Sequence, residues 1–374
     1  GGPMTEGVVL AHDYATQRGG AERVALLLAD AFPGSPMYTT LYDQGGTFPE
    51  FAKVPLRTGP LDRVRTLRRH HRLALPVLAP AIGGQRVDGD VLVASSTGWA
   101  HGYRGARRTV VYCHAPARWL YQRDRYLGSH GGSSSAAARS ALTALAPALR
   151  RWDVRAARRA DVYLANSTVT RLAIREAYGI DAQVVAPPPA LLPAGPAAPL
   201  PGVEPGFLLC VARLLPYKNV DVVVDAAAEL GRTLVVVGDG PERERLRSRA
   251  ARAGAGRVLL AGRVDDATLR WLYRNAALLV AASHEDYGLT PLEAGASGVP
   301  VAALRGGGYL DTVAEGVNGT FFDEARVDLV AGAVEKALAT VWDGVAIAAH
   351  VDGFGRDRFV ARLRDEVTRM REDR

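Results

Sequence analysis

Short apolar runs alternate with amphipathic segments along the 374 residues of the chain, and this alternation predicts a mixed α/β fold. The predicted strands of the first half lie at 7–13, 90–96, 109–115 and 161–167, and its predicted helices at 21–32 and 150–160. Each of these strands is a continuous apolar run, such as "DVLVASS", without regular polar positions. Continuous runs are typical of parallel strands that helices cover on both faces.

The same pattern begins again in the second half, so the sequence predicts two Rossmann-like, doubly wound domains. The predicted elements of this half lie at 207–213, 220–230, 233–240, 241–254, 257–262, 267–276 and 277–283. We expect domains at 4–186 and 207–354, joined by a linker at 187–206 that holds eight of the 22 prolines. The segment 355–374 predicts an amphipathic helix that packs back on the first domain.

The chain is basic, with a net charge of +7 and a pI of about 9.6. Such a surface suits phosphates, nucleic acid or an acidic membrane face. The arginines are scattered through helices without interleaved aromatic residues, so a nucleic-acid-binding protein is only the non-enzyme alternative. The arginine-rich helix at 150–160 and a Gly/Ser-rich loop at 127–141 are either solvated surface or contacts to an acceptor or an anionic membrane.

Cysteine usage and the absence of long apolar runs bear on location. Cys113 and Cys210 both lie inside apolar strand-like runs, which predicts buried free thiols in a reducing cytoplasm. No apolar run reaches the roughly 18 residues of a membrane span, and no basic stretch followed by an apolar core opens the chain. We therefore expect a cytoplasmic protein, with membrane association at the cytoplasmic face as a further expectation.

Ligands of doubly wound folds bind where strands lead into helices, and two such turns of the first half carry candidate residues. In "RGGAERV", Gly19 and Gly20 precede a helix and would let an anion approach the backbone; the alternative is an ordinary glycine turn. In "YCHAPARWLY", His114 ends a strand and would hydrogen-bond a substrate hydroxyl or transfer a proton; the alternative is a packed histidine.

Two further turns lie in the second half. In "VARLLPYKN", Arg213 and Lys218 suit a diphosphate, or are two solvated cations. In "SHEDYGLTPLE", Glu285 follows a strand and would accept hydrogen bonds from sugar hydroxyls. Glu293 stands in a capping box with Thr290 as the N-cap, so it either caps the helix or binds a ligand.

These four motifs, in this order, resemble those of retaining glycosyltransferases of family 4, which have the GT-B fold and include many mannosyltransferases. The E-x7-E pattern of that family is similar to Glu285–Glu293, and its "GGAE" motif is similar to Gly19–Glu22. The segments 296–313 and 319–323 also resemble the family. The resemblance spans nearly the whole chain and is strongest from 207 to 325.

The resemblance implies a role for each matching residue. Glu285 would bind hydroxyls of the donor sugar, and Glu293 would bind the ribose of a nucleotide. Arg213 and Lys218 would neutralise its diphosphate, and His114 would contact the sugar near the reacting carbon. The other implied substrate-binding residues are Gly19, Gly20, Arg263, Val264, Asp286, Tyr287, Gly288, Leu289 and Thr290.

The resemblance also implies a reaction. A hexose, with mannose or a related sugar favoured, would pass with retention from a nucleotide-diphosphate sugar, GDP-sugar favoured, to a hydroxyl of a glycan, lipid-linked intermediate or natural product, as in bacterial transferases. The alternatives are a UDP- or dTDP-sugar donor, or an epimerase or hydrolase. No metal or other cofactor is expected, because Asp88–Asp90 precedes a strand at the wrong end for a ligand site, and no zinc-like His/Cys spacing exists.

Overall fold

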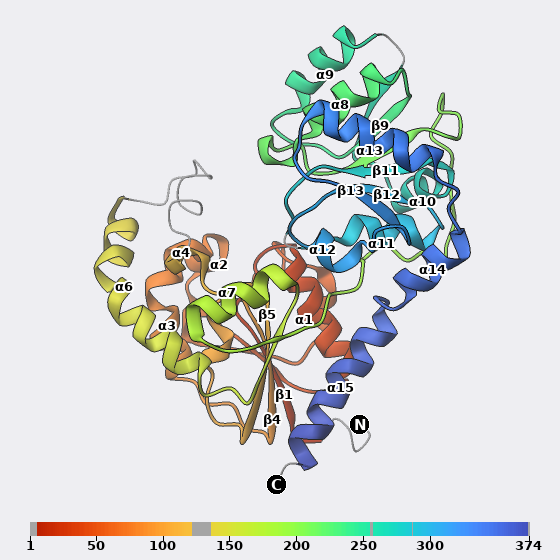
Figure 1. Ribbon diagram of the computed structural model, residues 1–374. Coiled ribbons are helices and arrows are strands. Elements are labelled where there is room, and N and C mark those ends of the chain that lie inside the picture. Colours follow the sequence, from red (N-terminus) through yellow and green to blue (C-terminus); the bar gives the residue numbers. More distant parts are fainter. Residues whose placement is uncertain (1–5, 122–135, 255–256, 286, 373–374) are drawn as a thin grey trace. The chain divides into compact units, whose positions relative to one another are not determined.

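The computed structural model describes residues 6–121, 136–254, 257–285 and 287–372 (Figure 1). They divide into two compact units. Unit 1 contains the chain up to Val185 together with Phe359 onward, and unit 2 contains Ala186–Arg358. Among the described helices, none is long and apolar enough to cross a membrane.

Unit 1 is built on a parallel sheet, as the continuous apolar runs predict. Its described strands are β1 (Val8–His12), β2 (Met37–Thr39), β3 (Leu56–Thr58), β4 (Val91–Ser96), β5 (Arg108–Cys113), β6 (Val162–Ala165) and β7 (Gln183–Val184). They pair in the order β3-β2-β1-β4-β5-β6-β7, with every pair parallel. The order reverses between β1 and β4, so ligands would bind beside the carboxyl ends of these two strands.

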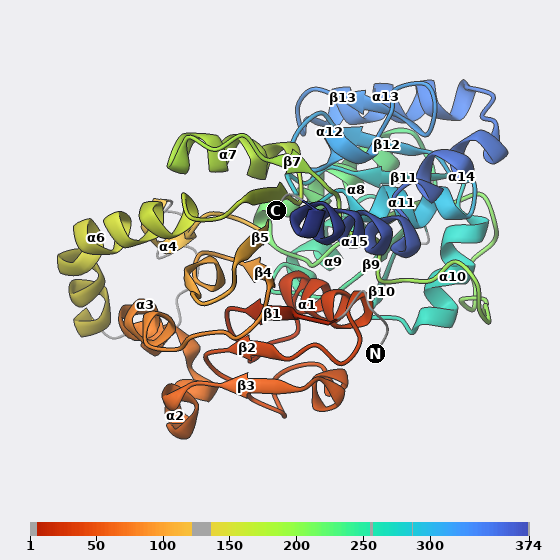
Figure 2. The same cartoon turned by 90° about the horizontal axis from the view of Figure 1, so that it is seen from below.

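Helices cover both faces of this sheet (Figures 1 and 2). The described α-helices of unit 1 are α1 (Gly20–Ala31), α2 (Arg65–Arg69), α3 (Leu75–Gly83), α4 (Arg118–Tyr121), α6 (Ala136–Ala157), α7 (Thr168–Tyr178) and α15 (Arg356–Glu372). The short 3-10 helices are η1 (Pro49–Lys53), η2 (Pro60–Arg63), η3 (His71–Ala74) and η4 (Ala100–Gly102). Residues of α1 and α15 pack on one face, and residues of α3, α6 and α7 on the other.

The C-terminal helix α15 contributes to the core of unit 1. Phe359, Leu363 and Val367 are buried in one cluster with residues of α1, β1, β4 and β5. The ring of Phe359 meets that of Tyr112 edge-on, with centroids 5.4 Å apart. Side chains at positions 359, 363 and 367 lie on one stripe of a helix, which explains why the amphipathic pattern marks this segment.

The predicted loop at 127–141 lies partly outside the described residues, which resume at 136. From Ala136 the chain is already the helix α6, so the end of the predicted loop and the start of the predicted helix at 150–160 were both placed wrongly. The segment "AAARSALTALAPALRR" is rich in alanine and leucine, and their helix propensity outweighs the serine that suggested a loop.

Unit 2 has a second parallel sheet with the order β10-β9-β8-β11-β12-β13. Its described strands are β8 (Leu208–Val211), β9 (Leu234–Val237), β10 (Val258–Gly262), β11 (Leu278–Ala281), β12 (Val301–Leu304) and β13 (Gly319–Phe322). Its described helices are η5 (Pro216–Lys218), α8 (Val220–Glu229), α9 (Arg243–Arg252), α10 (Asp266–Asn275), α11 (Leu289–Ala296), α12 (Tyr309–Thr312), α13 (Val327–Ala339) and α14 (Gly344–Asp352). Residues of α8 and α13 pack on one face, and residues of α10 and α11 on the other.

The proline-rich segment 187–206 packs on unit 2 and is not a free connector. Leu191, Leu200 and Val203 lie against the core cluster that contains α10. Guanidinium groups of α10 donate to its carbonyl oxygens, with Arg270 Nε 2.9 Å from Leu192 O. The prolines keep the segment irregular, as expected, and the cations of α10 satisfy backbone oxygens that have no strand partner.

Candidate functional site

Lys218 and Glu285 meet where β8 and β11 lie side by side at the switch point of the second sheet. Lys218 ends η5, which follows β8, and Glu285 follows β11. The ammonium group of Lys218 donates directly to Oε1 of Glu285. The two side chains are only 11% and 26% exposed, so solvent screens this ion pair less than a surface pair. The sequence singled out both residues but did not predict that they bind each other.

A hydroxyl group also donates to this carboxylate oxygen, and a second hydroxyl contacts the first. Ser283 Oγ donates to Glu285 Oε1 at 2.6 Å and lies 3.2 Å from the Tyr309 hydroxyl. Burial and the Glu285 charge raise the pKa of Tyr309 above its ordinary value, so it remains a neutral phenol. Burial and the same charge raise the pKa of the Cys210 thiol to about 12, so it is an unreactive thiol in the core.

Glycines fix the backbone position of Glu285. Gly308 N donates to the carbonyl oxygen of Glu285 at 2.6 Å. Gly307 has φ +57, and a Cβ atom there would lie 2.2 Å from the same oxygen. A Cβ on Gly308 would lie 2.5 Å from the carbonyl carbon of Tyr287. The turn after β12 therefore touches the turn after β11 through backbone atoms, which requires glycine at these positions.

Glu293 does not form the predicted capping box. Helix α11 begins at Leu289 with Gly288 as its N-cap, so Thr290 lies inside the first turn. Pro291 then stands third in the helix, where its missing N–H costs no intrahelical hydrogen bond. Glu293 Oε2 instead accepts a hydrogen bond of 2.6 Å from the hydroxyl of Tyr273, a buried residue of α10.

The remaining predicted donor-site residues of unit 2 occupy varied positions. Arg213 and Arg263 are exposed, and within the described ranges neither side chain has a hydrogen bond or ion pair with Lys218 or Glu285. Val264 is half-buried against the core cluster of α10 and α11. Asp286 lies outside the described residues, and Tyr287 is half-buried.

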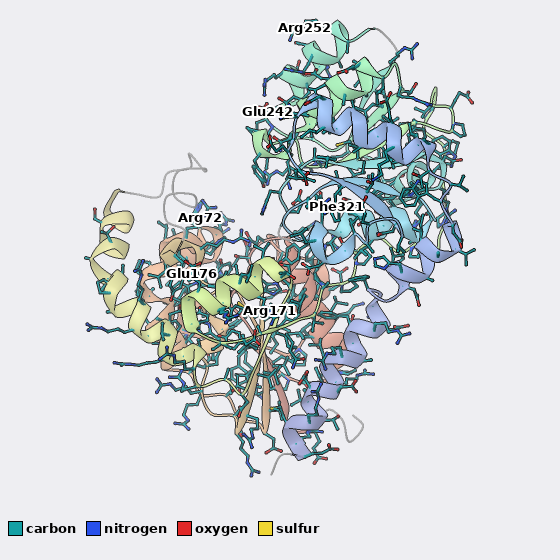
Figure 3. All side chains as sticks on the ribbon, in the orientation of Figure 1. Arg72, Arg171, Glu176, Glu242, Arg252 and Phe321 are labelled. Atoms are coloured by element: carbon teal, nitrogen blue, oxygen red, sulfur yellow. The ribbon has the colours of Figure 1, made fainter. Side chains whose placement is uncertain are left out.

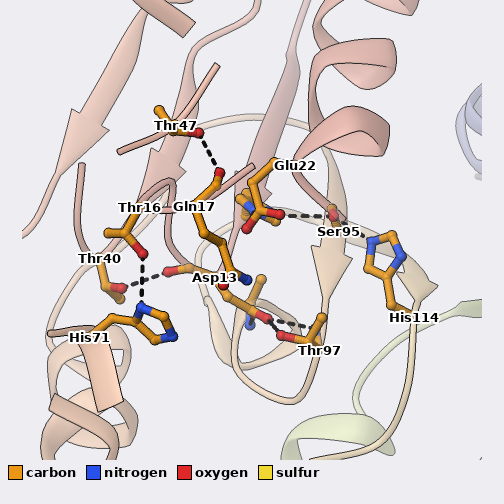
Figure 4. A network of polar contacts seen from close by, with 12 residues as sticks. Asp13, Thr16, Gln17, Glu22, Thr40, Thr47, His71, Ser95, Thr97 and His114 are labelled. Atoms are coloured by element: carbon orange, nitrogen blue, oxygen red, sulfur yellow. Dashed lines mark hydrogen bonds and ion pairs between the residues drawn. The ribbon is translucent and has the colours of Figure 1, made fainter. Parts of the chain in front are cut away.

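In unit 1, His114 lies at the carboxyl end of β5 beside two other polar side chains (Figure 4). Its Nε2 is 2.8 Å from Ser95 Oγ, and His12 Nδ1 is 3.1 Å from the same oxygen. His114 is 2% exposed, so it is packed inside the unit, as the alternative to a substrate contact describes. Burial, His12 and Arg118 lower the pKa of His114 to about 3, so the imidazole is neutral at physiological pH.

Asp13 ties the loop after β4 to the end of β1. Its carboxylate accepts hydrogen bonds from the backbone N–H groups of Thr97 at 2.6 Å and Ala100 at 2.5 Å. Asp13 is 1% exposed, and these donors compensate for burying its charge. The contact holds the carboxyl ends of β1 and β4 in register, where the sheet order reverses (Figure 4).

The glycine pair begins α1, with Gly19 as the N-cap and Gly20 as the first helical residue. A Cβ atom on Gly19 would lie 2.8 Å from Glu22 Oε2, so a side chain there would displace that buried carboxylate. Gly20 is exposed. The glycine at position 19 thus leaves room for a charge inside the unit, a role the sequence did not indicate.

No metal centre is formed by the described residues: none of them build a cluster of three His, Cys, Asp or Glu side chains around one point. Asp88 and Asp90 are exposed and precede β4 at its amino end, as predicted.

Sequence reasoning missed Ser283, Tyr309, Tyr273, Ser95 and His12. Ser283 ends the predicted strand 277–283, two residues before Glu285. His12 lies near the end of the predicted strand 7–13. Tyr309 follows the glycines of "RGGGYL", a second turn after a strand. Polar residues at the ends of predicted strands are the signal that would have found three of these five residues. Tyr273 had no such signal, because it lies within an amphipathic helix.

Comparisons with known proteins agree with this arrangement. Residues 197–340 match the family model described as "Glycosyl transferases group 1". A D-inositol 3-phosphate glycosyltransferase of Acidothermus cellulolyticus is 36% identical over 170 residues, which are 36% of this chain and 38% of the relative. A GDP-mannose-dependent alpha-(1-6)-phosphatidylinositol monomannoside mannosyltransferase of Mycolicibacterium smegmatis is 34% identical over 150 residues, 35% of this chain and 38% of the relative. The chain thus aligns with less than two fifths of these relatives' length.

Solved structures extend the likeness to both units. Anabaena HepE in complex with UDP superposes with a TM-score of 0.69 at 20% sequence identity, and covers 98% of this chain and 100% of HepE. The lipopolysaccharide outer core galactosyltransferase WaaB superposes with a TM-score of 0.66 at 16% identity, and covers 96% and 99%. The two Rossmann-like units therefore make up the GT-B fold of glycosyltransferases, as predicted.

Proposed function

We propose that this protein is a glycosyltransferase that moves a hexose from a nucleotide-diphosphate sugar to a hydroxyl acceptor, with retention at the anomeric carbon and without a metal ion. The observation that carries this proposal is the set of Lys218, Glu285, Ser283 and Tyr309 at the carboxyl ends of β8, β11 and β12. The set combines a cation for a diphosphate with a carboxylate for sugar hydroxyls. The match of 197–340 to group 1 glycosyltransferases covers all of these residues.

The proposed chemistry is electrostatic. When the glycosidic bond breaks, negative charge develops on the diphosphate, and a fixed cation beside it stabilises the transition state. Lys218 supplies that cation, and Arg213 is an exposed second one after the same strand. In this proposal Glu285 positions the sugar and also keeps Lys218 in place. The Lys218–Glu285 ion pair thus links the group that binds the sugar to the group that binds the diphosphate.

The donor proposal favours a GDP-sugar, mannose or a close relative. A name among the similar proteins supports it, since the M. smegmatis relative is called GDP-mannose-dependent. The structure of HepE with UDP supports the alternative of a UDP-sugar, and a dTDP-sugar is the third. Thermal-shift screening with GDP-, UDP- and dTDP-sugars separates them, because the bound donor raises the melting temperature as its concentration exceeds Kd. No shift with any donor would contradict the proposal.

Two variants test the assigned roles. Glu285→Ala removes the sugar contact and releases Lys218, so transfer should be lost while nucleoside diphosphate binding is retained or becomes tighter. Lys218→Ala should weaken nucleoside diphosphate binding. Normal transfer by Glu285→Ala would refute the site. Incubation with donor alone tests the epimerase and hydrolase alternatives, which would give an epimer or free sugar without an acceptor.

We also propose that unit 1 meets an anionic membrane through α2, η3, α3 and α6. Residues 63–86 contain six arginines and neither Asp nor Glu, and the first acidic residue of α6 is Asp153. Among these arginines, Val64 is 47% exposed and Val77 is 42% exposed. Helix α6 packs against α3, and its Leu145 is also 42% exposed. Exposed apolar side chains among arginines suit the interface of an anionic bilayer.

Co-sedimentation with vesicles tests this surface. The protein should bind phosphatidylglycerol-containing vesicles and not pure phosphatidylcholine, and Arg65→Glu/Arg69→Glu should abolish binding. Figure 3 shows Arg72 of this surface well apart from Arg171 of α7, so Arg171→Glu/Arg175→Glu is a charge-matched control within unit 1. Equal loss in both double variants would contradict a defined surface. A gel shift with nucleic acid that is lost only in Arg65→Glu/Arg69→Glu would favour the nucleic-acid alternative instead.

A further inference from the structure

Among the described residues, Asn219 is the only one besides glycines with a positive φ, and its φ of 54 with ψ 32 is the left-handed conformation. The 3-10 helix η5 ends at Lys218 and α8 begins at Val220, so the chain turns from one helix to the next within this single residue. A right-handed conformation at Asn219 would instead continue η5 into α8. The left-handed residue therefore sets the direction in which Lys218 leaves the turn.

The side chain of Asn219 joins this turn to the chain that follows β11. Asn219 is the N-cap residue of α8, but its amide points away from that helix, and Nδ2 donates to the carbonyl oxygen of Ala282 at 2.9 Å. The pairing of β8 with β11 reaches Leu209 and Leu279, so this bond lies beyond the paired part of the two strands. Ala282 is 2% exposed, and its buried carbonyl oxygen thereby gains a donor.

Asn219 connects the two sides of the Lys218–Glu285 ion pair. It follows Lys218 directly along the chain, and the ammonium group of Lys218 donates to Oε1 of Glu285. On the other side, Asn219 binds Ala282, and the next residue, Ser283, donates from its hydroxyl to the same Oε1 atom at 2.6 Å. A rotation of the turn at Asn219 would therefore move the ammonium group relative to the carboxylate.

Asparagine meets both requirements of this position. Gly, Asn and Asp are the residues that adopt the left-handed conformation routinely. Of these three, Gly has no side chain and an ionised Asp has no hydrogen to donate, so only Asn also supplies an N–H group for the Ala282 oxygen. The two requirements can be removed one at a time, because a glycine keeps the backbone conformation and loses the amide, whereas an alanine loses both.

We propose that Asn219 is a positioning residue that holds Lys218 where it binds the diphosphate of the nucleotide sugar. Its left-handed backbone turns Lys218 toward the end of β11, and its amide fixes the turn to the segment that carries Glu285. Asn219 acts through Lys218 and needs no contact with the donor. This inference rests on the proposed function for the identity of the ligand, whereas the residues of the turn all belong to unit 2.

Lysine NMR tests the positioning without any ligand. The chain has three lysines, and Lys53 and Lys336 are exposed whereas Lys218 is half-buried, so carbon-13 at lysine Cε should give three signals, of which Lys218→Arg removes one. The wild-type Lys218 signal should lie apart from the other two, because the Tyr217 ring is centred 5.0 Å from its Nζ. Asn219→Ala should move this signal toward those of the exposed lysines, and Asn219→Gly should move it less. An unchanged Lys218 signal in Asn219→Ala would overturn the proposal.

Calorimetry with inorganic pyrophosphate, GDP, UDP and dTDP measures the consequence for binding. None of these probes carries a hexose, so the measurement isolates Lys218 from the proposed contact of Glu285 with the sugar. Loss of the amide in Asn219→Gly should weaken binding by about 2- to 10-fold, the usual contribution of one hydrogen bond. Asn219→Ala should weaken it by roughly a further 5- to 30-fold, because alanine disfavours the left-handed conformation and lowers the population that binds. Wild-type affinity in Asn219→Ala would overturn the proposal.

Two comparisons separate positioning from a general loss of structure. Asn275→Ala removes an equivalent amide bond of unit 2, to the Trp271 carbonyl oxygen at 2.8 Å, and should change neither the Lys218 signal nor binding. In a Lys218→Ala background, Asn219→Ala should cause no further loss of GDP affinity, since a positioning residue acts through the group that it places. The same fold-loss in both backgrounds would overturn the proposal. Circular dichroism checks folding, and if Asn219→Ala does not fold, Asn219→Gly must still move the Lys218 signal and weaken binding.

The outcomes also distinguish this inference from the proposed function. If the wild-type protein binds neither pyrophosphate nor any of the three nucleoside diphosphates, while the Lys218 signal responds to Asn219 as expected, the proposed function is refuted and the positioning of Lys218 stands. If the wild-type protein binds these probes and the variants of Asn219 change neither the signal nor the affinity, the positioning role is refuted and the proposed function stands.

Discussion

The hydrogen bond from Tyr273 to Glu293 gives a sharp test of how unit 2 holds its second glutamate. Tyr273→Phe removes one hydroxyl and keeps the ring, which is 1% exposed. The lost interaction is a hydrogen bond to a carboxylate, at 2.6 Å, and such bonds contribute about 1.5–3 kcal/mol. Glu293 is half-buried and regains some water, so we expect the lower end, about 1.5–2 kcal/mol.

Urea denaturation followed by fluorescence measures this free energy of unfolding. For a unit of this size the change corresponds to a fall in Tm of roughly 3–8 °C. Tyr217→Phe is the matched control, because that residue is 58% exposed and its hydroxyl is solvated. If Glu293 also binds the ribose, calorimetry should show nucleoside diphosphate binding weakened by up to about tenfold in Tyr273→Phe. A stability within about 0.5 kcal/mol of the wild type would refute the structural role of this contact.

Three other predictions follow from the geometry. Gly307→Ala places a Cβ atom 2.2 Å from the carbonyl oxygen of Glu285, at a residue with φ +57, so the donor affinity measured by calorimetry should fall. Gly316→Ala is the control: its φ is also positive, but a Cβ atom there meets open space, so the donor affinity should not change. Phe359→Ala should cost about 3–5 kcal/mol in urea denaturation of unit 1, and a loss below about 1 kcal/mol would show that α15 is dispensable to the core. Because His114 has a pKa of about 3 in the folded protein and about 6.5 unfolded, the unfolded chain binds the proton first, and stability falls as pH drops from about 6.5 toward 3. The loss due to His114 is about 2 kcal/mol at pH 5, and His114→Asn should be less acid-sensitive by that amount.

The fold could be predicted from the sequence because parallel strands buried on both faces appear as continuous apolar runs. The runs that became β8, β9 and β11 are apolar throughout, those of β4 and β5 are apolar except at one end, and the helices between them carry clear amphipathic patterns. The edge strands β3 and β7 and the inner strand β2 were not predicted. They have only two or three residues, which is too short for any periodic pattern.

Side-chain partners could not be predicted in the same way. The sequence indicated that Lys218 and Glu285 lie at the ends of strands, but not that β8 and β11 are neighbours, which is why their ion pair was missed. Local rules also failed for Glu293, because the helix starts two residues earlier than predicted and the carboxylate binds Tyr273 of another helix in place of the capping box. Both errors concern contacts between distant segments, which only the pairing of the strands and the packing of the helices determine.

The position of α15 has a consequence for synthesis on the ribosome. The cluster that α1 forms on one face of the first sheet is completed by Phe359, Leu363 and Val367, which follow all of unit 2 in the chain. Proteins are made from the amino end, so unit 2 can bury its core while this face of unit 1 is still uncovered. The earlier-made unit therefore finishes folding last, and its apolar face is exposed to aggregation for as long as unit 2 is being translated.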